Sequence, residues 1–342
     1  MPLAMWMRRV ALAALLLCFG VVVLGAYVRL TAAGLGCPDW PGCYGHLSPV
    51  GAARSADLAQ AFPDRPLEVG KAWREMIHRY AVGTLACLIF LLALLAVRTR
   101  QQRLASVALA AALVATLLVQ AVLGALTVTW RLNPLIVTAH LVFGMTTLAL
   151  LWWLTLSLPT GSWGAAAPAG GGGAAMERAR RLALIGLAAL IVQIVLGGWT
   201  SSNYAAVACP DFPTCQGALW PPADFAHAFE PWHGQINYEG GVLENAARVA
   251  IHLTHRLGAL IATTALALAA VFVLRRRGLT AARLPAWAVL GALALQLLIG
   301  VSMVLRSFPL PLATAHTAGA ALLLLATLAL VRALSPRQRP AG

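Results

Sequence analysis

The sequence predicts an all-α polytopic membrane protein whose eight transmembrane helices form two parallel-repeated four-helix bundles. Three observations predict this fold: the composition, a series of apolar runs of spanning length, and an internal repeat. Of the 342 residues, 60% are hydrophobic and only 11% are charged, and the mean hydropathy is +0.79. A water-soluble chain of this length needs far more charge to cover its surface, so the composition excludes a soluble globular protein.

Eight apolar runs are each long enough to cross a hydrocarbon core of roughly 30 Å as a helix. They lie near residues 9–29, 76–97, 104–129, 134–157, 181–201, 246–274, 282–304 and 312–333. The first run is too long for a removed signal peptide, and it lacks a small-residue cleavage site. We therefore expect eight membrane-spanning helices, with two long loops and two very short connections on one side of the membrane.

The arginines orient these spans. They gather in clusters on one side of an eight-span chain, at Arg8 and Arg9, 98–103, 178–181, 275–283 and 332–339. The positive-inside rule makes that side cytoplasmic, so both termini are expected there. The net charge of +14 therefore reflects topology. No soluble basic face with interleaved aromatic residues is present, which excludes a nucleic-acid partner.

An internal repeat relates the two halves of the chain. Matching segments follow in the same order: CPDWPGC and CPDFPTC, MIHRYAVGTLA and LTHRLGALIA, QAVLG and QLLIG, VTAHL and ATAHT. The offsets run from 172 (Cys37 to Cys209) to 177 (His78 to His255). The sequence therefore predicts an N-terminal four-helix unit at 1–160 and a C-terminal unit at 177–342, related by an axis along the membrane normal. A Gly/Ala-rich cytoplasmic linker at 161–176 joins them.

Five of the eight histidines lie in predicted spans: His78, His140, His252, His255 and His316. An ionisable side chain inside a span is costly and usually marks function. Counted from the cytoplasmic ends of their helices, all of them except His252 stand roughly 24–30 Å above that border, at one level near the outer surface. Each unit supplies two of these four, one from its second span and one from its fourth.

Paired neutral imidazoles from facing helices favour a haem with two axial histidines in each four-helix bundle. Zinc is the chemical rival, since Glu75 beside His78 offers part of a zinc site. Zinc prefers a tetrahedral set closed by carboxylate or thiolate, and no second carboxylate lies at matching depth in the third or fourth span. The sequence therefore favours haem over zinc.

Arginines near the same boundary are candidates for pairing with haem propionates, because guanidinium matches carboxylate geometry. The alternative is that each arginine extends its charged end to the membrane interface, with no ligand involved. The candidates are Arg79, Arg256, Arg131 and Arg306.

The two units differ at one position beside the second-span histidine. Glu75 precedes His78 by three residues, where His252 precedes His255, and residues three apart share a helix face. A carboxylate beside a haem edge can move protons or stabilise developing positive charge. Equally, Glu75 can complement the macrodipole at the start of its helix. The sequence leaves both interpretations open and gives His252 no role.

Taken together, these segments resemble the haem A synthases over nearly the whole chain. The motifs that carry the resemblance are RLTAAGLGCPDWPGCYGH (29–46), KAWREMIHRY (71–80), NPLIVTAH (133–140), GGWTSSNYAAVACPDFPTCQG (197–217), NYEGGVLENAARVAIHLTHR (237–256) and PLATAH (311–316). The resemblance implies an eight-span enzyme of the bacterial inner membrane. It implies oxidation of the C8 methyl group of haem O to a formyl group, through hydroxylated intermediates with water as the oxygen source, giving haem A.

The resemblance also implies roles for individual residues. His255 and His316 are expected to ligate a haem b cofactor in the second half. His78 and His140 are expected to ligate the substrate haem O in the first half, with Glu75 as the catalytic carboxylate. The implied partners are a haem O synthase, a terminal oxidase in assembly, and an electron acceptor that the sequence does not identify.

Two other functions fit parts of the pattern. A di-haem cytochrome b would carry electrons between quinol and a partner without changing its haems, although it has less need for two unlike sites. A zinc-dependent intramembrane hydrolase or a metal transporter is the third interpretation.

Four of the six cysteines form the doubled C-x5-C motif in the two long outer loops. This spacing is too wide for the usual zinc motif, and the outer side is oxidising, where disulfides persist. We therefore expect the disulfides Cys37–Cys43 and Cys209–Cys215, each closing a short loop over one haem site. A redox role for these pairs is the alternative. Cys18 and Cys87 lie within spans and are expected to be apolar filler.

Overall fold

The computed structural model describes residues 2–55, 61–63, 65–98, 104–158, 173–234 and 236–335. Within these ranges the regular structure is helical, apart from two isolated β-bridges. Eight of the described helices are long and apolar enough to cross a membrane. The predicted all-α polytopic fold is therefore confirmed.

Each predicted apolar run lies in one helix. The helices are α1 (Pro2–Leu30), α4 (Val69–Arg98), α5 (Leu104–Thr129), α6 (Pro134–Ser157), α7 (Ala174–Ser202), α8 (Asn245–Arg275), α9 (Arg283–Leu305) and α10 (Leu310–Ala333), with the short elements α2 (Pro49–Ala53), η1 (Ala205–Ala208) and η2 (Arg277–Ala282). Helix α4 begins at 69 where we expected 76, and α7 begins at 174 where we expected 181. The added turns contain charged residues, such as Lys71 and Arg178, that hydropathy excludes but a helix accommodates.

Two very short turns join α5 to α6 and α9 to α10, as predicted. Asn133 caps α6, its side-chain oxygen accepting the Leu135 N–H at 3.0 Å, and Pro134 occupies the first helical turn. Two residues within each turn adopt positive φ, Arg131 and Leu132 in one turn and Ser307 and Phe308 in the other. These turns bring each fourth helix directly alongside the third.

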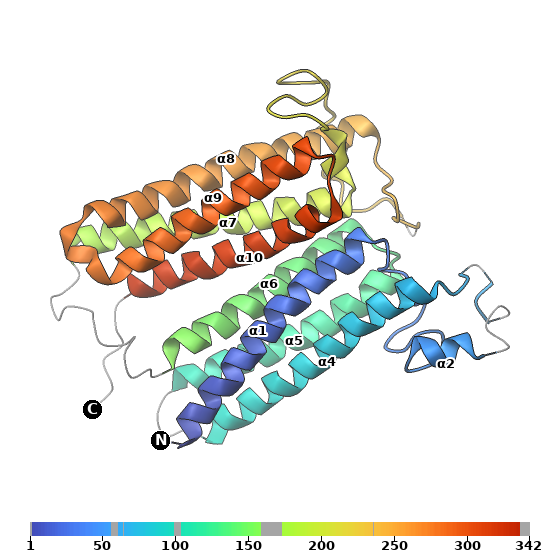
Figure 1. Cartoon of the computed structure of the whole chain (residues 1–342), viewed down its shortest axis with the longest axis horizontal. Helices are drawn as coiled ribbons and strands as arrows, with labels where there is room; N and C mark the ends of the chain where they lie inside the picture. The colour runs from blue at the N-terminus through green and yellow to red at the C-terminus, as the bar shows by residue number, and fades with distance from the viewer. Residues whose placement is uncertain are drawn as a thin grey trace.

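The helices form two groups that lie side by side (Figure 1). In the first group α1 packs against α4 and α6, and α5 packs against the same two helices; in the second, α7 and α9 both pack against α8 and α10. The groups meet where α6 contacts α7 and α10, and where α1 contacts α10. The equivalent contacts support the predicted repeat of two four-helix units, which stays a prediction.

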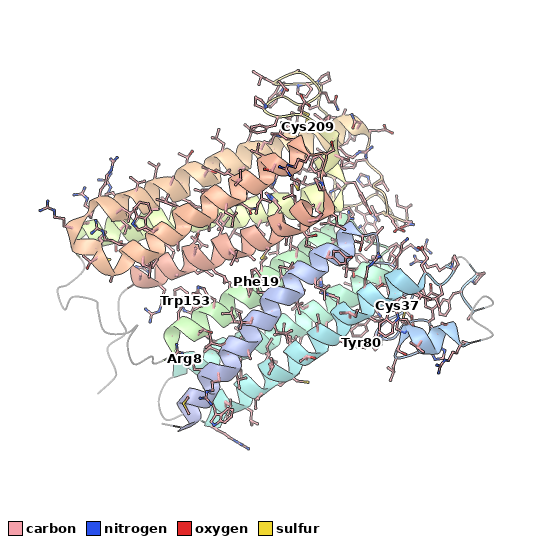
Figure 2. All side chains as sticks on the ribbon, in the orientation of Figure 1. Arg8, Phe19, Cys37, Tyr80, Trp153 and Cys209 are labelled. Atoms are coloured by element: carbon pink, nitrogen blue, oxygen red, sulfur yellow. A yellow bond between two sulfur atoms is a disulfide. The ribbon has the colours of Figure 1, made fainter. Side chains whose placement is uncertain are left out.

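One apolar core runs through both groups, and it includes Leu148 and Leu151 of α6, Leu266 of α8 and Leu330 of α10. Helix α1 starts and α10 ends at one end of the molecule (Figure 1), and Figure 2 shows Cys37 and Cys209 at the opposite end from Arg8. Most of the predicted 161–176 linker lies outside the described residues; α7 already begins within its last part. The predicted cytoplasmic arginines at 100, 103, 337 and 339 also lie outside them.

Candidate functional site

His255 of α8 and His316 of α10 lie opposite each other near the loop end of the second group. Their ring centroids are 6.5 Å apart and the ring planes cross at 72°. A metal ion binds an imidazole nitrogen at about 2 Å. Two rings on opposite sides of one metal therefore have centres roughly 6 Å apart. The pair thus has the spacing that two axial imidazoles of one iron require.

His78 of α4 and His140 of α6 form the corresponding pair in the first group, close enough to interact electrostatically. The Nδ1 atoms of both rings are buried, and neither has a hydrogen-bond partner among the described residues; the same holds for His316. A buried polar atom without a partner costs about 1–3 kcal/mol. Such atoms fit a site in which a ligand is expected to complete the contacts.

Each of these histidines packs against a glycine on the preceding spanning helix. A Cβ atom added to Gly25, Gly124, Gly197 or Gly300 would lie 3.1 to 3.5 Å from the Cε1 atom of His78, His140, His255 or His316, in that order. Ordinary carbon contacts fall at about 3.5–4.0 Å. The absence of a side chain at these glycines therefore leaves the space that the four histidine rings occupy.

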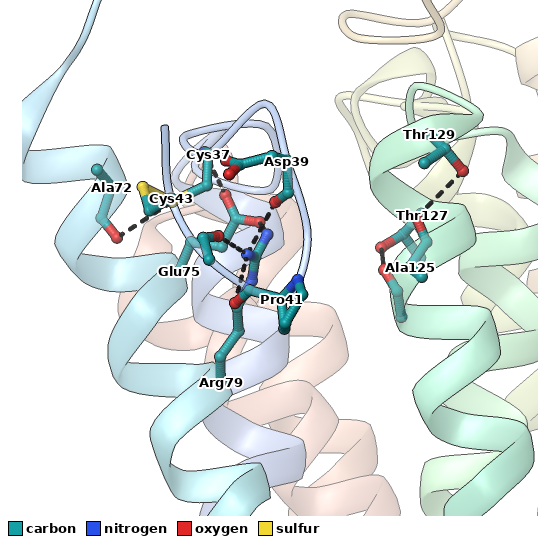
Figure 3. A network of polar contacts seen from close by, with 12 residues as sticks. Cys37, Asp39, Pro41, Cys43, Ala72, Glu75, Arg79, Ala125, Thr127 and Thr129 are labelled. Carbon is teal, nitrogen blue, oxygen red and sulfur yellow. Dashed lines mark hydrogen bonds and ion pairs between the residues drawn. A yellow bond between two sulfur atoms is a disulfide. The ribbon is translucent and has the colours of Figure 1, made fainter. Parts of the chain in front are cut away.

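Glu75 and Arg79 attach the first disulfide loop to α4 (Figure 3). Glu75 is 5% exposed; its Oε2 accepts the Cys37 N–H at 2.8 Å, and its Oε1 pairs with the Arg79 guanidinium at 2.5 Å. Arg79 also donates to three carbonyl oxygens of the loop, those of Asp39 (2.9 Å), Pro41 (3.2 Å) and Gly42. The candidate catalytic carboxylate therefore lies at the base of the disulfide loop, one turn before His78.

Arg256 makes the equivalent set of contacts in the second half. It donates to the carbonyl oxygens of Asp211 (2.7 Å), Pro213 (3.2 Å) and Thr214 (2.8 Å). His252 occupies the position of Glu75, and its buried ring hydrogen-bonds through Nδ1 to the carbonyl of Ala205 in η1 at 3.1 Å. Both second-span arginines thus hold a disulfide loop, and their predicted contact with propionates stays a prediction.

The other two candidate arginines lie in the short turns. Arg131 follows α5 and Arg306 caps the end of α9, and both are exposed. Their position at the loop end of the molecule agrees with the sequence analysis, and their role toward a ligand stays a prediction.

Both predicted disulfides are confirmed. Cys37 and Cys43 are joined with an S–S distance of 2.04 Å, and Cys209 and Cys215 with 2.00 Å. In each loop the second cysteine forms an isolated β-bridge three residues on, Cys43 with His46 and Cys215 with Ala218. Cys18 and Cys87 are free thiols.

No cluster of three or more His, Cys, Asp or Glu side chains within the described ranges is arranged to hold a metal ion. The site offers histidines in twos, which suits an iron whose other ligands come from a porphyrin. The sequence analysis missed one set of contacts here: Gln193 and Gln296 hydrogen-bond to His255 and His316. For Gln296 the sequence signal is its place in the repeated QAVLG and QLLIG segments, and Gln193 had no such signal.

The fold and the site define a class: a multi-pass helical membrane protein with paired histidines toward one end of its helices and a disulfide-closed loop at that same end. Comparison with known proteins then gives the family. A family model described as cytochrome oxidase assembly protein (COX15-CtaA) matches residues 8–328. A Heme A synthase of Shewanella oneidensis is 42% identical over 94% of this chain and 93% of its own.

More distant relatives carry the same name. The Heme A synthase of Nitrosospira multiformis is 28% identical over 96% of this chain and 92% of its own, and that of Caulobacter sp. K31 is 29% identical over 94% and 93%. The chain belongs to the haem A synthase family, and the resemblance inferred from its motifs is confirmed.

Proposed function

We propose that the protein is an enzyme of haem A biosynthesis that oxidises the C8 methyl group of haem O to a formyl group. The methyl carbon first becomes an alcohol, its oxygen coming from water, and then a gem-diol that loses water. In sum, one methyl group and one water give one formyl group, four protons and four electrons. The electrons leave to an acceptor that the chain does not itself supply.

The observation that carries this proposal is the spacing of His255 and His316, which admits one iron between two imidazoles. In this proposal these two residues hold a haem b, and His78 and His140 hold the substrate. Bound haem b supplies a one-electron redox centre near the substrate. Helices α6 and α7 pack directly on each other, since a Cβ on Gly198 would lie 3.1 Å from side-chain atoms of Thr138 and Leu141. This contact supports close neighbouring sites.

The chain's own residues orient the substrate. Gly25 and Gly124 give His78 and His140 the room to face the bound haem. We assign to Glu75 the stabilisation of positive charge that develops at the methyl group before water adds. Its pairing with Arg79 and the Cys37 N–H holds the carboxylate in a fixed place one turn before His78.

The same proposal places the protein in a bacterial inner membrane with both termini cytoplasmic. The support is the arginine distribution: Figure 2 shows Arg8 at the end of the molecule away from the disulfides, and Arg332 lies in the last turn of α10, which ends there too (Figure 1). The disulfide loops then face the oxidising periplasm. Haem O is expected from a haem O synthase in the same membrane, and haem A passes to a terminal oxidase during its assembly.

Mass analysis of the haems extracted from purified protein tests the function. We expect haem b together with haem O, its alcohol derivative or haem A. In His255→Ala the haem b fraction should fall, and in His78→Ala the fraction derived from haem O should fall. Haem b alone at both sites would favour a di-haem electron carrier and contradict the proposal. Stoichiometric zinc without haem would contradict both functions.

A further inference from the structure

Two glutamines contact the histidine pair of the second half. Gln193 of α7 donates through Nε2 to the backbone oxygen of His255 at 3.0 Å and lies 3.1 Å from the ring Nδ1. Gln296 of α9 donates through Nε2 to the backbone oxygen of His316 at 3.1 Å, and the same atom lies 3.3 Å from Nε2 of the His316 ring. Each amide therefore reaches both the backbone and the ring of one histidine.

A glycine three residues after each histidine makes these contacts possible. A Cβ on Gly258 would lie closer than 3 Å to the Gln193 amide, and a Cβ on Gly319 would do the same to Gln296. Real Cβ atoms do not approach other atoms so closely. The two glutamines therefore occupy places that only glycine leaves open on α8 and α10.

In the first half, neither of these glutamine–histidine contacts has its glutamine and glycine together at the equivalent positions. Val21 stands 172 positions before Gln193, the offset that relates Gly25 to Gly197, and Ala81 stands in the place of Gly258.

On the other helix pair of the first half, Gln120 matches Gln296, but Phe143 stands in the place of Gly319. The Gln120 amide instead lies beside Gly144, within 3.0 Å of where a Cβ would be. Within the described residues no hydrogen bond joins Gln120 to His140. The Nδ1 atoms of His78, His140 and His316 all lack a partner among the described residues, so at these rings the two halves differ in the glutamine contacts alone.

A histidine that ligates a metal through one nitrogen commonly donates its other N–H to an oxygen, which fixes the ring orientation and raises its basicity. An amide carries one acceptor oxygen and one donor nitrogen on the same carbon, so half a turn of the amide exchanges them. The Oε1 atoms of Gln193 and Gln296 are buried and have no partner among the described residues. Half a turn of the amide would bring this spare acceptor to the ring of His255 or His316, in exchange for the hydrogen bond from Nε2 to the backbone oxygen.

We propose that Gln193 and Gln296 are positioning residues that fix His255 and His316, so that the second half retains its haem. The first half, without these contacts, binds its haem through freer rings and releases it. This inference rests on the proposed function and deepens it: it explains why one haem stays as a cofactor and the other leaves as product.

The test compares Gln193→Leu and Gln296→Leu with the matched control Gln120→Leu in purified full-length protein. Haem release is followed by capture with excess apomyoglobin, and the low-spin ferric spectrum and midpoint potential of the retained haem are recorded. Removing such a partner costs roughly 10–100-fold in metal affinity. We expect haem b release to accelerate by about that factor in both variants, with a shifted potential, and to stay unchanged in the control. Gln193→Glu, which keeps an acceptor oxygen, should restore slow release.

A gain-of-function variant covers the case in which the leucine variants fold poorly. Val21→Gln with Ala81→Gly introduces the glutamine and glycine of the Gln193–His255 contact into the first half. We expect this variant to release the substrate haem more slowly. Wild-type release rates and spectra in both leucine variants, or an equal change in Gln120→Leu, would overturn the inference while leaving the proposed function intact. Wild-type protein that holds no low-spin haem would instead overturn the proposed function.

Discussion

The rings of His255 and His316 lie 6.5 Å apart, and each touches a glycine on the neighbouring helix. This packing makes the width of the site depend on residues that do not ligate anything. A larger side chain at such a glycine moves the ring and changes the distance between the two rings.

Gly300→Leu should therefore prevent the second half from holding a haem. Its side chain would push into His316, since even a Cβ would stand 3.1 Å from Cε1. Overpacking costs about 1–3 kcal/mol, or roughly 5–150-fold in affinity. Haem b content, measured by absorbance after purification, should fall by that order. Gly291→Leu on the same helix is the control, because a Cβ there meets nothing within 4 Å; equal loss in the control would contradict the site.

Glu75→Gln should keep haem b and lose haem A production by about 100-fold or more, the scale of losing one preorganised electrostatic contact. The variant keeps the size of the side chain and an acceptor for the Cys37 N–H, but it loses the charge that pairs with Arg79. Product is measured as haem A by mass. Full production with intact haem binding would exclude the catalytic role and leave Glu75 as an anchor for the disulfide loop.

Arg256→Gln should loosen the second disulfide loop. The loop then loses three carbonyl contacts to a guanidinium, and hydrogen bonds to charged groups contribute about 1.5–3 kcal/mol each. Hydrogen exchange of the Cys215 and Ala218 amides, which bond to each other's carbonyls, should accelerate by about tenfold or more. Arg306→Gln, at an exposed position, is the control. Unchanged exchange in Arg256→Gln would show that the disulfide alone holds the loop.

Asp224 and His227 form an exposed pair in the second outer loop, with Nδ1 and Oδ2 2.6 Å apart. The Asp224 carboxylate raises the pKa of His227 above 6.5, and His227 lowers the pKa of Asp224 below 3.8. The contribution of His227 to loop stability is present below its unfolded pKa and is lost as pH rises through the raised value. That of Asp224 is present above its unfolded pKa and is lost as pH falls through the lowered value.

Between those limits the pair is complete, so Asp224→Asn should lower the pKa of His227 toward its ordinary value. Titration of labelled histidine by NMR measures it. A His227 pKa that is the same in wild type and variant would show that the pair does not form in solution.

Several features of this protein follow from local sequence alone. Span positions depend on runs of apolar residues, and the short turns before α6 and α10 depend on Asn133 and Pro309. The pairing of Cys37 with Cys43 and of Cys209 with Cys215 depends on spacing and side of the membrane. Hydropathy, helical rise and turn chemistry act over a few residues, which is why these predictions agree with the structure.

The separations and hydrogen bonds of the site residues, in contrast, depend on tertiary structure. The sequence placed His255 and His316 at one depth, but the packing of α7 to α10 sets their separation and brings Gln193 and Gln296 onto them. The packing of each disulfide loop on its helix likewise brings Arg79 and Arg256 to loop carbonyls and Glu75 to the Cys37 N–H. These contacts join residues tens of positions apart, and the two glutamine contacts exist only where Gly258 and Gly319 let the helices approach. A one-dimensional pattern records the glycine, but only the packed helices show which side chain fills the space beside it.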